Sequence, residues 1–202
     1  MVHAFSLVHD DLPALDDDDE RRGQPASHVR YGEAVAVLVG DALLSSAYRL
    51  VAERLDAPAD VRLGVIEELA RGVAGMIDGQ YLDVTAVGMP GHEELTRLHR
   101  LKTGALITAA VACGARVAEV PDAGLDGYRR FAAELGLLFQ IVDDILDDGS
   151  PDEPSYVNTF GLDEARRLAG ESRGRAEALL AELPGDTAEL AELTELIAVR
   201  DR

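Results

Sequence analysis

Residues 139–147 of the chain read Phe139-Gln140-Ile141-Val142-Asp143-Asp144-Ile145-Leu146-Asp147. The stretch ends an apolar segment with helical character, and Asp143 and Asp147, four residues apart, would share one helix face. Like charges on an apolar helix repel each other and resist burial. A hard cation such as Mg²⁺ between the carboxylate oxygens would stabilise them. The alternative is an ordinary charged helix end with Asp147 and Asp148 in water, and this stretch alone does not decide between the two.

A second acidic cluster near the start of the chain favours the metal site. Residues 9–20 read His9-Asp10-Asp11-Leu12-Pro13-Ala14-Leu15-Asp16-Asp17-Asp18-Asp19-Glu20. They follow an apolar segment whose large side chains recur near helical spacing. Two aspartate clusters that each end an apolar helix can face each other across a helical bundle. We therefore predict that the clusters face each other across a central cavity and hold several metal ions.

The composition predicts an all-α protein. Hydrophobic residues make up 47% of the chain and aromatic residues only 4%, which favours helices over strands. The 202 residues suffice for a single domain with a substantial core. No strand-like alternation is present, so we expect about seven helices. These lie near residues 1–11, 32–55, 60–87, 92–117, 125–147, 162–183 and 186–199.

Charge and cysteine content restrict the partners and the location. The formal charge of −19 argues against nucleic-acid binding, which needs a basic surface, and an anionic ligand would need metal ions as a bridge. Cys113 is the single cysteine and fits a core residue in a reducing compartment. Uncharged runs such as residues 103–115 are too short for a membrane span, and residues 1–8 lack the features of a secretory signal. We expect a cytoplasmic protein without a membrane span.

Short motifs with charged residues and glycine are spread over residues 1–147. They are Phe5-Ser6-Leu7-Val8-His9-Asp10-Asp11-Leu12-Pro13-Ala14-Leu15-Asp16, Arg21-Arg22-Gly23-Gln24-Pro25, Gly40-Asp41-Ala42-Leu43, Gly79-Gln80 with Asp83, Lys102-Thr103-Gly104, and Phe139-Gln140 to Asp147. In this order they resemble the trans-polyprenyl diphosphate synthases, the family of the bacterial farnesyl and geranylgeranyl diphosphate synthases. The resemblance implies an isoprenoid-synthase-type helical bundle around a central cavity.

The resemblance also implies a reaction. An allylic diphosphate, dimethylallyl or geranyl, would ionise to a carbocation and condense with isopentenyl diphosphate to farnesyl diphosphate. About three Mg²⁺ ions would neutralise the departing pyrophosphate, which is the Lewis-acid role of a metal. The candidate metal ligands are Asp10, Asp11, Asp16, Asp143, Asp144 and Asp147.

Two arginines and one phenylalanine are candidate substrate-binding residues. Arg21 and Arg22 offer forked donors for phosphate oxygens, although pairing with the acidic residues 16–20 is an alternative. By resemblance, Phe5 forms the floor of the pocket into which the product chain grows. Its bulk points to farnesyl diphosphate over longer products.

Lys102, Thr103 and Gln140 are the candidate catalytic residues. Lys102 is the only lysine among 19 basic residues, and a need for a compact point charge would explain why it is kept, although chance could do the same. By resemblance, Lys102 contacts the allylic diphosphate, while Thr103 and Gln140 face the developing cation. Oriented dipoles of this kind stabilise charge without reorganising. A threonine within a helix is more often an ordinary core residue, and Gln80 and Asp83 have the same alternative.

Two features of the family are not found. Its N-terminal helices, which carry elements for isopentenyl diphosphate, would precede Met1, and residues 148–158 lack the lysines of the family's longer loop. We therefore expect a single polyprenyl-synthase-like domain that is N-terminally incomplete, with Arg22 the only recognised anchor for isopentenyl diphosphate. Such a chain should condense its substrates slowly or not at all. A fragment of a full enzyme and a shortened relative are both compatible with the sequence.

Other functions remain as alternatives. A geranylgeranyl diphosphate synthase differs only in the length of its product, and a non-catalytic partner subunit would keep the helical dimer surface. A terpene cyclase fits less well, because it is not expected to combine the Arg-Arg-Gly and Lys-Thr-Gly elements with both aspartate clusters. The helices at residues 32–55 and 60–87 carry more apolar surface than a solvent-facing layer should, which predicts a homodimer.

Overall fold

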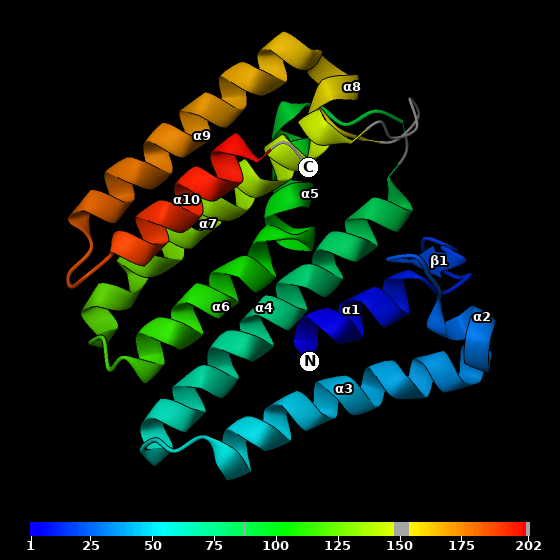
Figure 1. Ribbon diagram of the computed structural model, residues 1–202, viewed down its shortest axis with the longest axis horizontal. Coiled ribbons are helices and arrows are strands. Elements are labelled where there is room, and N and C mark those ends of the chain that lie inside the picture. Colours follow the sequence, from blue (N-terminus) through cyan, green and yellow to red (C-terminus); the bar gives the residue numbers. More distant parts are fainter. Residues whose placement is uncertain (87, 148–153, 201–202) are drawn as a thin grey trace. The chain divides into compact units, whose positions relative to one another are not determined.

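The computed structural model describes residues 1–86, 88–147 and 154–200. Within these residues the chain forms ten helices and one two-stranded antiparallel sheet (Figure 1). The elements are α1 (Val2–Asp10), β1 (Glu20–Arg21), β2 (Gln24–Pro25), α2 (Ser27–Tyr31), α3 (Glu33–Arg54), α4 (Ala59–Thr85), α5 (His92–Lys102), α6 (Gly104–Val117), α7 (Asp122–Leu146), α8 (Tyr156–Phe160), α9 (Leu162–Glu182) and α10 (Ala188–Val199). The predicted all-α class is confirmed. The chain divides into two compact units, residues 1–66 and 67–202, so the single domain stays a prediction.

In the first unit, α1 packs along α3 (Figure 1). The contact is close because Gly40 has no side chain: a Cβ at this position would lie 2.0 Å from Nε2 of His9. The His9 ring is also held by a hydrogen bond between its Nε2 and the Val37 carbonyl oxygen, at 3.1 Å. The small residue in the Gly40-Asp41-Ala42 motif thus lets α3 approach the end of α1 that leads to Asp10.

The loop expected at residues 13–30 contains a short hairpin and a helix. β1 and β2 pair with Glu20 opposite Pro25 and Arg21 opposite Gln24. The two turn residues, Arg22 and Gly23, have φ angles of 54° and 73°, as a tight two-residue hairpin turn requires. Strands of two residues are too short to produce visible alternation in the sequence, so the hairpin was not expected.

Helix α3 is apolar and largely exposed. Its most apolar window of 18 residues has a mean hydropathy of 1.5, and only 17% of that window is buried. Val35, Leu38 and Leu50 are among its exposed side chains. By length and composition alone α3 could cross a membrane, although Asp41 and Arg49 interrupt its apolar run, so the expected absence of a membrane span stays a prediction.

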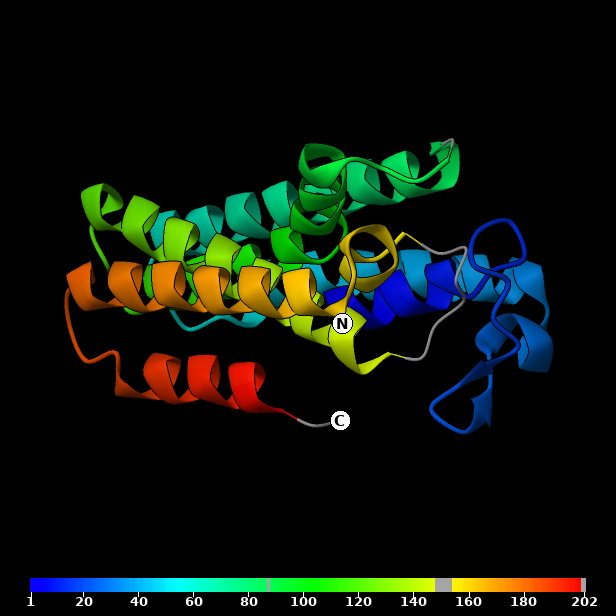
Figure 2. The ribbon, with the colours of Figure 1, turned by 90° about the horizontal axis from the view of Figure 1, so that it is seen from above.

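The second unit is built around α7. This helix packs on α6 and on α9, and α10 returns along both α7 and α9 (Figures 1 and 2). Two groups of buried side chains form its core. One contains Phe131, Leu135, Ala176 and Leu180, and the other contains Leu95, Leu98, Leu137, Ile141, Tyr156 and Ala165. The helix expected at residues 125–147 therefore corresponds to the central helix of this unit.

The single helix expected at residues 92–117 is wrong, because the chain bends at Thr103 (φ −108°, ψ −49°) and divides it into α5 and α6. Neighbouring helices approach closely on both sides of this bend. A Cβ at Gly79 of α4 would lie 2.2 Å from the Lys102 backbone nitrogen, and one at Gly136 of α7 would lie 2.9 Å from Cα of Gly104. The Lys102-Thr103-Gly104 motif therefore occupies a space that glycines on α4 and α7 leave open.

Helix α8 was also not expected. It begins after Ser155, whose hydroxyl oxygen accepts a hydrogen bond from the Asn158 backbone N–H at 3.0 Å. A serine at this position satisfies one of the unpaired donors of a helix start. Residues 148–153 of the expected loop lie outside the described residues.

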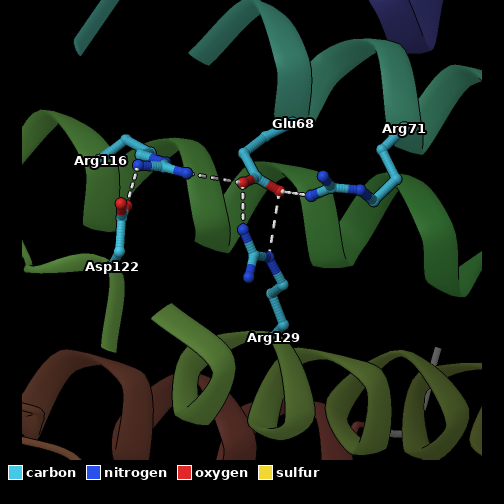
Figure 3. Close-up of polar contacts among 5 residues, drawn as sticks. All are labelled: Glu68, Arg71, Arg116, Asp122 and Arg129. Carbon is cyan, nitrogen blue, oxygen red and sulfur yellow. Dashed lines mark hydrogen bonds and ion pairs between the residues drawn. The ribbon is translucent and has the colours of Figure 1, made fainter. Parts of the chain in front are cut away.

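A buried carboxylate joins three helices of the second unit. Glu68 of α4 has a side chain only 2% exposed, and it accepts hydrogen bonds from Arg71 at 2.7 Å and from Arg129 of α7 (Figure 3). Arg116 of α6 approaches it at 3.6 Å. Burial by itself would raise the pKa of Glu68, but the hydrogen bond and charge of Arg129 outweigh it, so the pKa lies below its ordinary value. Burial, with the Glu68 charge, raises the pKa of nearby Cys113 to about 11, which keeps this thiol protonated.

We predict that Glu68→Gln destabilises the protein by about 3 kcal/mol at neutral pH, because three arginines lose their buried partner. The exposed neighbour provides the control, and Glu67→Gln should change stability by less than about 0.5 kcal/mol. Because folding lowers the pKa of Glu68, its contribution is complete above about pH 4.3, the ordinary value, and is lost as the pH falls through the folded-state pKa. In urea denaturation, the free energies of unfolding of the wild type and Glu68→Gln should therefore differ less in acid than at pH 7. Equal stability of the two variants at pH 7 would contradict the assignment.

Candidate active site

The first aspartate cluster lies where α1 ends. The Asp16 backbone N–H donates to the Asp10 carbonyl oxygen at 2.9 Å, so the turn brings the first and last predicted ligands of this cluster back to each other. Asp11 is buried, and its carboxylate accepts hydrogen bonds from Arg21, one of them from Nε at 2.9 Å. Arg21 also pairs with Asp18 at 2.9 Å. The hydrogen bond to Asp11 raises the pKa of Arg21, which stays charged.

The three predicted substrate-binding residues of the first unit have different surroundings. Arg21 pairs with the acidic run, the alternative that the sequence left open, and this bond holds Asp11 in place. Arg22 is exposed at the hairpin turn. Phe5 is buried one helical turn before His9, with the two rings edge to face and their centroids 4.9 Å apart. The substrate roles of Arg21, Arg22 and Phe5 stay predictions.

In the second unit, neighbouring aspartates of α7 have different environments. The Asp143 side chain is 51% exposed and pairs with Nη2 of Arg200 at 2.6 Å. The Arg200 guanidinium also lies over the Phe139 ring, 4.2 Å from its centroid. Asp147 is exposed at the end of α7, and Asp144 is buried. Successive helix positions are about 100° apart, which explains why one aspartate faces solvent and the next faces the core.

Asp144 is held by neutral donors from two segments. One carboxylate oxygen accepts from the Gln140 side-chain amide at 2.9 Å, and the other accepts from the Tyr156 backbone N–H at 2.7 Å. Nε2 of His99 lies 3.5 Å from the second oxygen. The oxygen of the Gln140 amide in turn accepts from the Thr103 hydroxyl at 2.8 Å. Thr103, Gln140 and Asp144 are therefore consecutive members of one hydrogen-bonded chain.

Lys102 is positioned from α4. Its Nζ donates to the Asp83 carboxylate at 2.5 Å, and its backbone packs against Gly79, one helical turn earlier on the same face of α4. Asp83, which the sequence left as a possible packing residue, therefore orients the only lysine of the chain. The structure thus brings Lys102 and Thr103 to one end of α5 and places Gln140 and Asp144 beside Thr103.

A cavity of about 810 Å³ in the second unit adjoins Asp83 and Lys102, because their chain neighbours Leu82 and Leu101 line it. It is lined by Asp78, Tyr81, Leu82, His92, Glu93, Thr96, Arg97, Arg100 and Leu101. None of the predicted site residues lines it. That the two aspartate clusters face each other across a cavity stays a prediction.

The carboxylates suit magnesium even though they do not form a ready-made site. Within the described ranges, no three His, Cys, Asp or Glu side chains are grouped so that they could hold a metal ion. Mg²⁺ does not require such a group, because it is usually bound by one or two carboxylates together with substrate phosphates and water. The exposed Asp143 meets this requirement, with Asp10 and Asp16 as further candidates.

Sequence reasoning did not find three of the residues that shape the site. Arg200 reaches Asp143 from beyond α10, and Tyr156 binds Asp144 through its backbone, so neither contact leaves a pattern in the sequence. The third is His99, whose Nε2 lies 3.5 Å from Asp144 and whose ring is stacked on Tyr156 with the centroids 5.4 Å apart.

Comparison with known proteins finds relatives that align with nearly the whole chain. The chain is 40% identical over 221 residues to the chloroplastic geranylgeranyl pyrophosphate synthase of Catharanthus roseus, an alignment that covers 100% of this chain and 62% of that protein. It is 40% identical over 229 residues to the farnesyl diphosphate synthase of Escherichia coli strain K12, covering 100% of this chain and 75% of the relative. The Helicobacter pylori geranyltransferase, solved in complex with magnesium and isoprenyl diphosphate, superimposes with a TM-score of 0.82 at 30% identity, covering 97% of this chain and 70% of the other.

The chain thus spans less than two thirds of one curated relative and three quarters of the other. The polyprenyl synthetase family matches residues 1–155, a range that contains both aspartate clusters, Lys102, Thr103 and Gln140. The family inferred from the sequence is confirmed, and both expected products occur in the names of the relatives. With 155 of its 202 residues matched, this chain belongs to the polyprenyl synthetase family.

Proposed function

We propose that the chain is a Mg²⁺-dependent trans-prenyltransferase, which condenses dimethylallyl or geranyl diphosphate with isopentenyl diphosphate to farnesyl diphosphate. The observation that carries the proposal is that Thr103 and Gln140 are hydrogen-bonded to each other and to Asp144 of the second aspartate cluster, while the neighbouring Lys102 is held by Asp83. The names of the relatives support the reaction class. We also propose that the protein acts in the cytoplasm.

The polar groups suit the separation of charge that such a reaction requires. Lys102 presents an ammonium group for a diphosphate oxygen, and Asp83 holds that group in place beforehand. Thr103 and Gln140 are fixed dipoles, which stabilise a developing cation without having to reorient. Bound Mg²⁺ would supply the positive charge that makes pyrophosphate a better leaving group.

Asp143 and Arg200 suggest how the metal site changes on binding. Asp143 is the exposed carboxylate of the second cluster, and Arg200 occupies it with an ion pair at 2.6 Å. A metal ion and this guanidinium would compete for the same oxygens. We therefore propose that Arg200 leaves Asp143 when Mg²⁺ and a diphosphate bind, and that Asp10 and Asp16 provide the ligands of the first cluster.

The alternatives are tested by the product and by its absence. Farnesyl diphosphate is favoured over geranylgeranyl diphosphate because Phe5 is a large buried residue in the helix that leads to Asp10. A non-catalytic partner subunit would bind diphosphates without forming product. Arg21, which Asp11 holds, and the exposed Arg22 remain the candidates for further phosphate contacts.

The proposed function is tested by calorimetry with pyrophosphate and Mg²⁺, followed by product analysis with both prenyl substrates. We expect each ligand to strengthen binding of the other, condensation by this chain to be slow or absent, and any product to be mainly farnesyl diphosphate. Asp143→Asn should lower turnover by about 10²-fold, whereas Asp163→Asn, at an exposed position of α9, should not.

The same titration includes an arm for Arg200. Arg200→Ala should lower the Mg²⁺ concentration for half-maximal binding roughly two- to fivefold, since a partly exposed ion pair contributes about 1 kcal/mol or less. Arg167→Ala, on the outer face of α9, is the matched control. Binding without product is expected both of a partner subunit and of a chain that condenses its substrates slowly or not at all. Pyrophosphate binding that ignores Mg²⁺ would contradict the proposal.

We further propose that the protein is a homodimer. Exposed apolar side chains on α3 and α4, among them Leu38, Leu63 and Ile77, support an interface between two copies. Analytical ultracentrifugation at micromolar concentration should give twice the chain mass of 21.6 kDa. A monomer mass would rule out this assembly for the chain.

A further inference from the structure

We infer that Asp144 is a positioning residue: it orients the Gln140 amide and, through it, the Thr103 hydroxyl, and it does not ligate the metal. The sequence alone grouped Asp144 with the metal ligands because it lies between Asp143 and Asp147. The inference rests on the proposed function for its catalytic consequence. Its structural part stands on the contacts of Asp144 itself.

Both carboxylate oxygens of Asp144 already accept hydrogen bonds. One accepts from Nε2 of Gln140 at 2.9 Å and the other from the Tyr156 backbone N–H at 2.7 Å. The side chain is only 7% exposed, compared with 51% for Asp143. Each oxygen keeps a further lone pair, but a hydrated ion could reach it only if this buried side chain turned out of the core and away from its donors. Asp143 can ligate after the displacement of one arginine.

Asp144 determines the direction of the hydrogen bonds that join it to Gln140 and Thr103. A carboxylate has no hydrogen to donate, so only the NH₂ end of the Gln140 amide can face Asp144. The amide oxygen must then point to Thr103, whose hydroxyl lies 2.8 Å away and donates its only hydrogen to this oxygen. The Thr103 oxygen is thereby left with its lone pairs for other neighbours. A group that faces a developing cation should present lone pairs and not a hydrogen.

The buried Tyr156 prevents Asp144 from turning away from Gln140. Tyr156, which donates its N–H to Asp144, is itself 1% exposed, and its hydroxyl forms a hydrogen bond with Thr96 of α5 at 2.7 Å. Its ring is stacked on His99, also of α5, with an angle of 29° between the planes. Burial raises the pKa of Tyr156, so the hydroxyl keeps its hydrogen. Tyr156 is thus anchored to α5, the helix that ends immediately before Thr103. Both ends of the series of hydrogen bonds from Thr103 to Tyr156 are therefore held by α5.

Asp144→Asn tests the inference because it keeps the shape and removes one acceptor. The new asparagine side chain would be best placed with its oxygen toward Tyr156 and its NH₂ toward Gln140. The Gln140 amide would then turn over, and the Thr103 hydrogen would point away from it. We expect kcat to fall roughly 10- to 100-fold, with the Mg²⁺ concentration for half-maximal activity unchanged within about twofold. Asp143→Asn should instead raise that concentration by about tenfold or more.

A double-mutant cycle shows whether Asp144 acts through Gln140. In a Gln140→Leu background the amide is absent, so Asp144→Asn should lower kcat by less than about threefold more. Asp144→Glu, which keeps a carboxylate but displaces its oxygens, should also lower kcat with a normal Mg²⁺ response. If both Asp144 variants weaken Mg²⁺ as Asp143→Asn does, or if their effects multiply with Gln140→Leu, Asp144 does not act through Gln140 and the inference is overturned.

A spectroscopic arm separates this inference from the proposed function. The side-chain amide signals of Gln140 are identified in a ¹⁵N-correlated NMR spectrum as the pair lost in Gln140→Leu. Asp144→Asn should shift this pair, and Asp147→Asn, at an exposed position, should not. The result does not depend on turnover, so an inactive protein would refute the enzyme and leave this test intact. An unmoved Gln140 signal in folded Asp144→Asn, as judged by circular dichroism, would overturn the inference.

Discussion

A carboxylate that leaves water must be given partners, and the second unit of this protein is organised by three such carboxylates on or against α7. Glu68 is held by arginines of α4, α6 and α7. Glu134, on α7, accepts from Arg100 of α5 at 2.5 Å and from Arg175 of α9 at 2.9 Å. Asp144, near the end of α7, is held by Gln140 and by the start of α8. Each carboxylate therefore joins α7 to neighbouring segments, and together they determine how those segments pack.

The three carboxylates differ in the charge of their partners. Arginines hold the two that lie away from the proposed catalytic residues, and uncharged donors hold the one beside them. Burial alone would raise the pKa of Glu134, but Arg100 and Arg175 lower it, as Arg129 does for Glu68. Arginines thus compensate the charges in the structural part of the unit. The hydrogen bonds to Asp144 come from an amide side chain and a backbone N–H, with His99 3.5 Å away, and no arginine contacts it within the described residues. A carboxylate without an arginine partner beside Thr103 and Gln140 suits the proposed reaction, in which a carbocation forms.

The sequence predicted most of the helices because their apolar positions recur at helical spacing, but it did not predict where that spacing is interrupted. The bend at Thr103 depends on close contacts with Gly79 and Gly136, which lie far away in the chain. The hairpin at residues 20–25 is too short to produce a periodic signal. Motif spacing located Lys102, Thr103, Gln140 and the aspartates, and the structure adds which of them contact one another. Asp143 and Asp144 look equivalent in the sequence, but in the structure Asp143 faces solvent and pairs with Arg200, whereas Asp144 faces the core and accepts from Gln140 and Tyr156.

The most direct test of this account is a crystal structure of the protein with Mg²⁺ and pyrophosphate. The account predicts a metal–oxygen distance of about 2.0–2.1 Å at Asp143, with Arg200 displaced. Asp144 should still accept from Gln140 and from the Tyr156 backbone, and the Thr103 hydroxyl should still donate to Gln140. Direct coordination of a metal ion by Asp144, with the Gln140 contact broken, would contradict the distinction between the two aspartates on which the account depends.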